Sequence, residues 1–125
     1  MSVLLDTSVI IDVLRALPAA IRYTTSLKEV PTCSEITRVE VLRGLRSAER
    51  TATERLFRSL RWAGIDETVA RRAGEIGRTY RRSHMGVGTT DLIIAATAEE
   101  LGLTVATLNV KHFPMISGLR APYRG

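Results

Sequence analysis

Four oxygen-bearing side chains stand where a parallel sheet would bring them together. Asp6 directly follows the first short apolar run, Asp91 opens a strongly apolar segment, and Asn109 follows an apolar, β-branched run near the end. Glu40 lies at the edge of an apolar helical stripe and is placed less firmly. Carboxylate and amide oxygens are ligands that Mg²⁺ and Mn²⁺ accept. An ion held in this way can activate water for attack on a phosphodiester.

Each of these side chains also has an ordinary structural explanation. Asp6 could cap the first helix, and Asp91 could complement a helix terminus. Glu40 could reach solvent from its helix, and Asn109 could be a turn residue. As a set they favour a shared site, because carboxylates crowded at one rim repel and would otherwise take up protons. A dication removes that penalty, so the set predicts a metal site formed by Asp6, Glu40 and Asp91.

Extended and helical patterns alternate along the chain. Short apolar runs predict strands over residues 3–5, 30–33 and 103–108, and a possible edge strand near Leu119. Helical periodicity predicts helices over residues 8–14, 18–28, 34–45, 49–62, 68–82 and 91–101, with 65–67 a short strand or a cap. The alternation predicts an α/β fold, a three-layer sandwich in which a central parallel sheet is flanked by helices on both faces. Strand ends and helix starts then share one rim, where such sheets hold their ligands.

Cap signals define where several helices begin. Thr7 or Ser8 is expected to cap the first helix, and Ser34 the third. Thr89 and Thr90 are the cap candidates before the apolar helix that contains Asp91.

Apolar spacing predicts which faces of the helices are buried. Ile36, Val39 and Leu42 form the expected inner stripe of the third helix. Asp12 falls off the apolar stripe of the first helix, so it is expected to be a solvated acid. Cys33 is expected to be a small apolar residue in or near a strand.

Length and composition describe an ordinary globular protein. The 125 residues are 45% hydrophobic and 25% charged, which fits a single domain over 1–125. With one cysteine, the chain cannot form an internal disulfide. The start carries no basic leader, and no apolar run approaches the roughly 18 residues of a membrane helix. A cytoplasmic location is expected.

The charge balance favours a polyanionic partner. The net charge is +5, and Lys28 and Lys111 are the only lysines among 18 basic residues. Arginine forks suit bidentate contacts with phosphate, although a generic arginine-rich surface is an equal alternative. Aromatic residues make up only 5% of the chain, too few for a platform that stacks single-stranded bases.

Four segments together resemble a known family. They are LLDTSVII at 4–11, TRVEVLRGL at 37–45, TDLIIAATA at 90–98 and ATLNVKHF at 106–113. In order and spacing they resemble a PIN domain, and more narrowly the VapC-type ribonuclease toxins of bacterial and archaeal toxin–antitoxin pairs. The resemblance spans nearly the whole chain.

The resemblance implies an endoribonuclease that depends on Mg²⁺ or Mn²⁺. Asp6, Glu40 and Asp91 match the acidic positions of the family, and Asn109 matches a fourth position that is often Asp. Because an amide supplies no negative charge, one tightly held ion is expected and a second is in doubt.

The resemblance also concerns neighbouring side chains. Ser8 and Thr107 fall where the family places hydroxyls near the metal, with capping and core roles equally open. His112 could serve as an acid–base group, but packing beside Phe113 is the expectation, and His84 is expected to lie on a surface loop.

The implied partners are structured RNA, such as transfer or ribosomal RNA, and a small VapB-like antitoxin. The amphipathic second and fourth helices could expose an apolar groove or could simply close the core; in the family such a groove receives the antitoxin, whose tail reaches the acidic site. A homodimer, or a larger toxin–antitoxin hetero-oligomer, is expected.

Two other functions fit part of the pattern. A phospho-accepting signalling domain also gathers acids around Mg²⁺, and Lys111 stands in a suggestive place for one. That class requires adjacent acids after the first strand, where this chain has Thr7 and Ser8 beside Asp6. A catalytically silent RNA-binding module, with the acids serving only as caps, is the third possibility.

Overall fold

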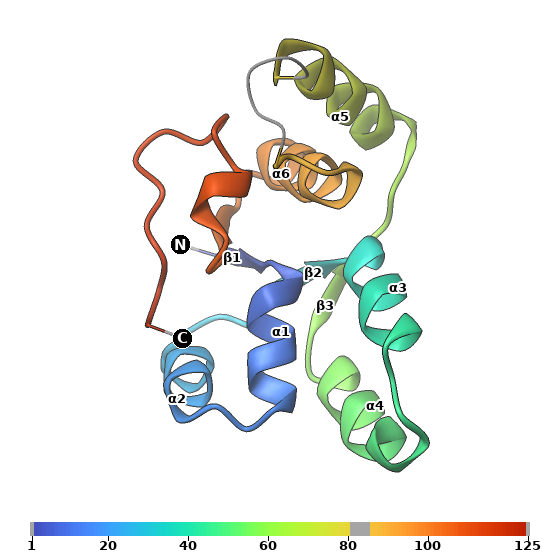
Figure 1. Cartoon of the computed structure of the whole chain (residues 1–125), viewed down its shortest axis with the longest axis vertical. Coiled ribbons are helices and arrows are strands. Elements are labelled where there is room, and N and C mark those ends of the chain that lie inside the picture. Colours follow the sequence, from blue (N-terminus) through green and yellow to red (C-terminus); the bar gives the residue numbers. More distant parts are fainter. Residues whose placement is uncertain (1, 81–85, 125) are drawn as a thin grey trace.

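Four short parallel strands form the centre of the molecule (Figure 1). The computed structural model describes residues 2–80 and 86–124. The strands are β1 (Val3–Leu5), β2 (Thr32–Ser34), β3 (Arg61–Ala63) and β4 (Thr104–Ala106), in the spatial order β3-β2-β1-β4. The helices are α1 (Thr7–Leu14), α2 (Pro18–Ser26), α3 (Glu35–Arg43), α4 (Arg50–Arg58), α5 (Glu67–Tyr80) and α6 (Thr89–Leu101), with short 3₁₀ turns η1 (Ser47–Glu49) and η2 (Val110–His112).

The sheet is covered by helices on both faces, as predicted. Successive strand residues point to opposite faces, so Leu4 and Val105 belong to one apolar cluster while Leu5 and Ala106 belong to the other. The first cluster packs against α5 and α6, and the second against α1 and α4. The buried members of each cluster are mostly aliphatic, with one phenylalanine in each, and Cys33 lies fully buried in the second. Burial raises the pKa of its thiol to about 12, which fits the predicted role as a core residue.

The central position of β1 decides where the chain's polar ends meet. β1 pairs with β2 on one side and with β4 on the other, with Leu5 opposite Ala106. The N–H of Asp6 continues this pairing and donates to the carbonyl of Ala106 at 2.9 Å. Residues that follow β1 and β4 therefore lie side by side, although they come from opposite ends of the sequence.

The helix expected over 49–62 is shorter than predicted. After η1, α4 ends at Arg58, and Arg61–Ala63 form the fourth strand, which pairs in parallel with β2. Two contacts hold Trp62 in the strand. Its ring packs edge-on against Phe57, with 5.0 Å between the ring centroids, and its indole N–H donates to the Phe57 carbonyl. Pairing with β2 therefore outweighs the predicted continuation of the helix over residues 59–62.

The inner face of α3 also differs from the prediction. Val39 is 56% exposed and Leu42 is 36% exposed, while Ile36 packs against the α5–α6 cluster. The buried face instead carries Val41 and Thr37. Thr37 can be buried because its hydroxyl is hydrogen-bonded to that of Thr7 at 2.9 Å.

Two helix starts differ from the expected caps. Asp6, and not Thr7 or Ser8, occupies the N-cap position of α1, although its side chain makes no capping hydrogen bond. Gly88 occupies the N-cap position of α6, so Thr89 and Thr90 are already helical. As a result, Asp6 lies at the start of α1 and Asp91 lies in the first turn of α6.

Of the other local predictions, some are confirmed and others are wrong. Ser34 caps α3 by accepting the N–H of Ile36, as expected. Asp66 caps α5 by accepting the N–H of Val69, so 65–67 is a cap and not a strand. The segment near Leu119 forms turns and bends without an edge strand. Residues 81–82 of the expected helix and His84 lie outside the described residues.

None of the helices in the part of the chain described has the length and apolar character that a membrane crossing requires.

Helix α1 ends in a left-handed turn without glycine. Ala16 has φ +59°, its N–H donates to Val13, and the N–H of Leu17 donates to Asp12. This is the double hydrogen bond that normally places glycine at the left-handed position. We expect Ala16→Gly to raise the free energy of unfolding by about 1 kcal/mol, because it removes the clash of Cβ in this conformation. Urea unfolding followed by circular dichroism measures the effect, and an unchanged or lower value contradicts it.

Candidate active site

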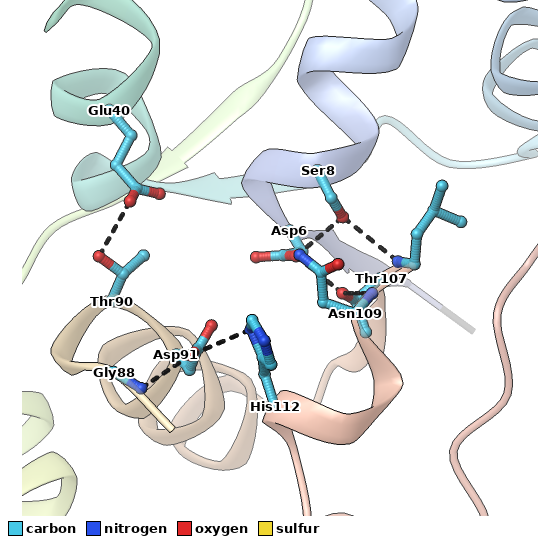
Figure 2. Close-up of polar contacts among 10 residues, drawn as sticks. Asp6, Ser8, Glu40, Gly88, Thr90, Asp91, Thr107, Asn109 and His112 are labelled. Atoms are coloured by element: carbon cyan, nitrogen blue, oxygen red, sulfur yellow. Dashed lines mark hydrogen bonds and ion pairs between the residues drawn. The ribbon is translucent and has the colours of Figure 1, made fainter. Parts of the chain in front are cut away.

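One cavity of about 690 Å³ opens at the rim where β1, β4 and α6 meet. Asp6, Glu40, Asp91 and Asn109 all line it. Figure 2 shows that they reach this space from different elements: the end of β1, α3, the first turn of α6, and the segment after β4. The structure therefore brings together the four side chains that the sequence predicted, including Glu40, which was placed least firmly.

Asp6 is fixed in place by two hydroxyl groups. Its side chain is 3% exposed, and Ser8 Oγ and Thr107 Oγ1 both donate to Asp6 Oδ2, at 2.9 and 2.7 Å. Asp6 Oδ1 has no hydrogen bond within the described structure, and the residue lines the cavity. One carboxylate oxygen is thus anchored and the other is available to a ligand.

The two hydroxyls connect Asp6 to the segment after β4. Ser8 Oγ also accepts the N–H of Leu108 at 3.2 Å, and Thr107 Oγ1 accepts the N–H of Asn109 at 2.9 Å. Thr107 is fully buried. Both hydroxyls therefore position the carboxylate, and they also set the backbone that carries Asn109.

Asp91 lies in the first turn of α6. Its Oδ2 accepts the N–H of Gly88 at 2.9 Å, which satisfies a free donor at the helix start. Burial raises the pKa of this carboxyl above its usual range, and the negative charges of Asp6 and Glu40 raise it further. The Gly88 N–H and His112 act in the opposite direction. The pKa of Asp91 therefore depends on the charges of the two other acids that line the cavity.

Glu40 reaches the cavity from the side of α3. Its Oε2 accepts a hydrogen bond from Thr90 Oγ1 at 3.1 Å. This contact joins α3 to the first turn of α6, and it orients the carboxylate toward the neighbourhood of Asp91 (Figure 2).

Two side chains of the cavity were placed wrongly by sequence. His112 was expected to pack beside Phe113, but its side chain is 42% exposed and its Nδ1 lies 3.5 Å from Asp91 Oδ2. Asp12 was expected to be solvated, but it is partly buried, lines the cavity and accepts the hydroxyl of Tyr123 at 2.9 Å. No pattern in the sequence indicates the 3₁₀ turn that brings His112 beside Asp91. No local signal announces the Tyr123 contact, which joins residues far apart in the chain.

Arg15 was not singled out from sequence, yet it also lines the cavity. A second groove of about 400 Å³ begins beside it, between α1, α3, η1 and α4. Its apolar walls include Leu14, Val41 and Leu45. The sequence predicted an apolar groove on the second and fourth helices; α4 does contribute, but the partners of α4 are α1 and α3, and no residue of α2 lines it.

The donor set of the cavity is suited to a hard cation. Asp6, Glu40 and Asp91 present carboxylate oxygens, and Asn109 presents an amide oxygen or nitrogen. Within residues 2–80 and 86–124, however, no three acidic, histidine or cysteine side chains converge as a preformed metal cluster. The chemistry of the donors fits a dication, while their side chains are spread around the cavity.

Comparison with known proteins identifies the family to which the chain belongs. A family model for the PIN domain matches residues 3–116. Ribonuclease VapC10 of Mycobacterium tuberculosis is 43% identical over 123 residues, which cover 97% of this chain and 92% of the relative. The tRNA(fMet)-specific endonuclease VapC of Shigella flexneri is 27% identical over 123 residues, covering 94% of this chain and 93% of the relative.

A solved structure shares the fold as well. A chain in a toxin–antitoxin complex from Klebsiella pneumoniae superposes with a TM-score of 0.79 at 28% identity, covering 98% of both chains. The family model spans most of the sequence, and a VapC ribonuclease shares 43% of residues over nearly all of it. This chain therefore belongs to the PIN domain family and, within it, to the VapC ribonucleases.

Proposed function

We propose that this chain is a Mg²⁺-dependent endoribonuclease, the toxin of a toxin–antitoxin pair, which hydrolyses a phosphodiester bond in structured RNA in the cytoplasm. The observation that carries the proposal is the cavity lined by Asp6, Glu40, Asp91 and Asn109, which come from four separate motifs. The names of the relatives support the substrate class, since one is a ribonuclease and another acts on a transfer RNA. Transfer or ribosomal RNA is the expected substrate.

The acidic side chains would have different roles at the metal ion. Asp6 and Asp91 would hold Mg²⁺, or Mn²⁺, through their cavity-facing oxygens. Glu40 would bind the ion directly or through water, or orient the attacking water. The ion, when bound, supplies activation of water and offsets negative charge that builds on the phosphate oxygens. Asn109 would contribute only its carbonyl oxygen, which supports one tightly held ion rather than two.

The signalling-domain alternative finds little support in the site. Thr7, next to Asp6, is hydrogen-bonded to Thr37 and supplies no second acid. Lys111 is exposed and does not line the cavity. The silent RNA-binding module differs from the proposal only in chemistry, so cleavage decides between them.

Metal removal tests the proposal directly. We expect purified protein to cleave folded transfer RNA with Mg²⁺, and EDTA to lower the rate by at least about 100-fold, because the ion supplies several kcal/mol of the rate enhancement. Excess Mn²⁺ added after EDTA should restore cleavage. Gel analysis of end-labelled RNA gives the rate. Cleavage that persists in EDTA contradicts the metal, and RNA binding without any cleavage favours the silent module.

An antitoxin partner is part of the same proposal. The similar Klebsiella pneumoniae chain belongs to a toxin–antitoxin complex. The apolar groove beside Arg15 adjoins the acidic cavity, since Ile11, Arg15 and Glu40 line both. A VapB-like segment seated in this groove would reach the acids and block the site.

The exposed apolar residues of α3 support the expected homodimer. Val39 is 56% exposed and Leu42 is 36% exposed on one side of the helix. We expect Val39→Glu to convert a dimer into a monomer, because a charge would be buried without a partner. Light scattering after gel filtration measures the mass. Ile21→Glu, on the exposed face of α2, is the matched control. A wild-type monomer, or equal effects of both variants, contradicts this assignment.

A further inference from the structure

The active-site cavity is strongly acidic for a protein whose substrate is a polyanion. Asp6, Asp12, Glu40 and Asp91 all line it. One dication would offset two of these four carboxylates, so the cavity would still repel an RNA strand. A fixed cation is therefore needed at its edge. Within the described structure, Arg15 is the single arginine or lysine that lines this cavity.

The guanidinium of Arg15 is not committed to another side chain. Its side chain makes no hydrogen bond or ion pair with any described residue. The nearest acid on the same helix, Asp12, is engaged by the hydroxyl of Tyr123. Other arginines are used differently: Arg38, Arg71 and Arg72 each pair with a glutamate. Arg15 thus keeps its full set of donors for a ligand.

The backbone fixes where Arg15 stands. It caps the C-terminus of α1, with its N–H donating to the Ile11 carbonyl at 2.9 Å, immediately before the left-handed Ala16. A helix rises about 1.5 Å per residue, which places the Arg15 backbone about 13 Å from Asp6 along α1. Arg15 also lines the neighbouring groove. It therefore stands at the edge of the cavity, beyond the acids.

We infer that Arg15 binds a phosphate of the RNA that flanks the cleaved bond, and so positions the strand over the acids. This inference rests on the proposed function. Its distance from Asp6 suits a neighbouring phosphate rather than the reacting one, so Arg15 contributes to binding and takes no part in bond breaking. A bidentate contact from its planar fork fixes the register of the strand without reading its sequence.

Two substitutions at one position test the inference. Arg15→Gln removes the charge and Arg15→Lys keeps the charge but not the fork. Arg22→Gln, an exposed arginine of α2 that does not line the cavity, is the matched control. RNA affinity is measured by fluorescence anisotropy in an Asp6→Asn background between 50 and about 200 mM salt, the range in which phosphate contacts change affinity. Steady-state cleavage is measured without the Asp6 change.

The expected results separate binding from chemistry. Arg15→Gln weakens RNA binding about 10- to 100-fold, as expected for loss of a charge-assisted contact. It also lowers the salt slope by about one, raises KM and leaves kcat nearly unchanged. Arg15→Lys keeps the slope and recovers part of the affinity. Thermal melting of each variant should match the wild type, because Arg15 supports no other side chain.

Other outcomes overturn the inference. If Arg15→Gln binds RNA with the same affinity and slope as Arg22→Gln, Arg15 contacts no phosphate. If it keeps RNA affinity but loses binding to the antitoxin, its ligand is the protein partner. A fall in kcat at unchanged KM would place it in the chemical step instead. Failure of the wild type to cleave RNA would overturn the proposed function, while the salt slopes would still decide the role of Arg15.

Discussion

We expect Asp6→Asn to abolish RNA cleavage while leaving the fold intact. The carboxylate is almost fully buried, and its Oδ2 accepts two hydrogen bonds, from Ser8 and Thr107. Asparagine keeps the size of the side chain but loses the negative charge that would hold a dication. Because metal assistance accounts for several kcal/mol of a hydrolytic rate, the loss should reach about 1,000-fold or more.

The measurement pairs a cleavage assay with a metal titration. We expect calorimetry to show that Mn²⁺ binding is lost in Asp6→Asn, while its melting temperature remains close to that of the wild type. Asp66→Asn is the matched control, because that residue is exposed and caps α5, where asparagine caps equally well. Unimpaired cleavage by Asp6→Asn would remove this carboxylate from the site.

We expect Asp91→Asn to have two opposite effects, a loss of cleavage and a gain in stability of the metal-free protein. Burial raises the pKa of Asp91, and the charges of Asp6 and Glu40 add to the shift. Its ionised form is therefore unfavourable in the folded state. Asparagine removes that charge and can still accept the N–H of Gly88. Cleavage should fall by about 100-fold or more, since one of the two carboxylates proposed to hold the ion is lost.

The stability gain should depend on pH in a defined direction. From the ordinary value of 3.8 up to the raised folded pKa, the folded state binds more protons than the unfolded state. The contribution of Asp91 to the free energy of unfolding therefore decreases as pH rises through this window. We expect Asp91→Asn to melt at a higher temperature than the wild type at pH 7 in EDTA. The difference should vanish below pH 3.8, where both states are protonated. A lower melting temperature at pH 7 would show that the helix-start charge outweighs burial.

The sequence predicted which side chains gather at the rim, because a few geometric rules of parallel sheets decide their positions. Parallel strands share one rim, so Asp6 and Asn109 had to meet once β1 and β4 were neighbours. Asp91 joined them because helix starts face the same rim. Two predictions failed where tertiary contacts decide: the buried face of α3, on which Val39 and Leu42 are exposed, and the extent of α4. Thr37 is buried through a hydrogen bond to Thr7, and Trp62 leaves the helical pattern to pair with β2.

The remaining site residues depend on contacts that no local pattern encodes. Asp12 is partly buried because Tyr123, from the far end of the sequence, donates its hydroxyl to it. Arg15 lines the cavity from the C-cap position of α1, next to a left-handed Ala16, a conformation that the alanine itself does not indicate. His112 lies beside Asp91 because η2 turns back over the rim. Only the assembled fold shows that these three side chains line the cavity.

The hydroxyl pair on Asp6 has a consequence for the cell that makes this protein. Thr107 belongs to the last strand's end, whereas Asp6 is among the first residues translated, and the two are joined by a 2.7 Å hydrogen bond. A growing polypeptide on the ribosome therefore lacks one of the two hydroxyl groups that fix this carboxylate until nearly all of the message has been read. We expect a product that ends before Thr107 to hold Asp6 through Ser8 alone and to cleave RNA weakly, which would spare the cell from truncated toxin.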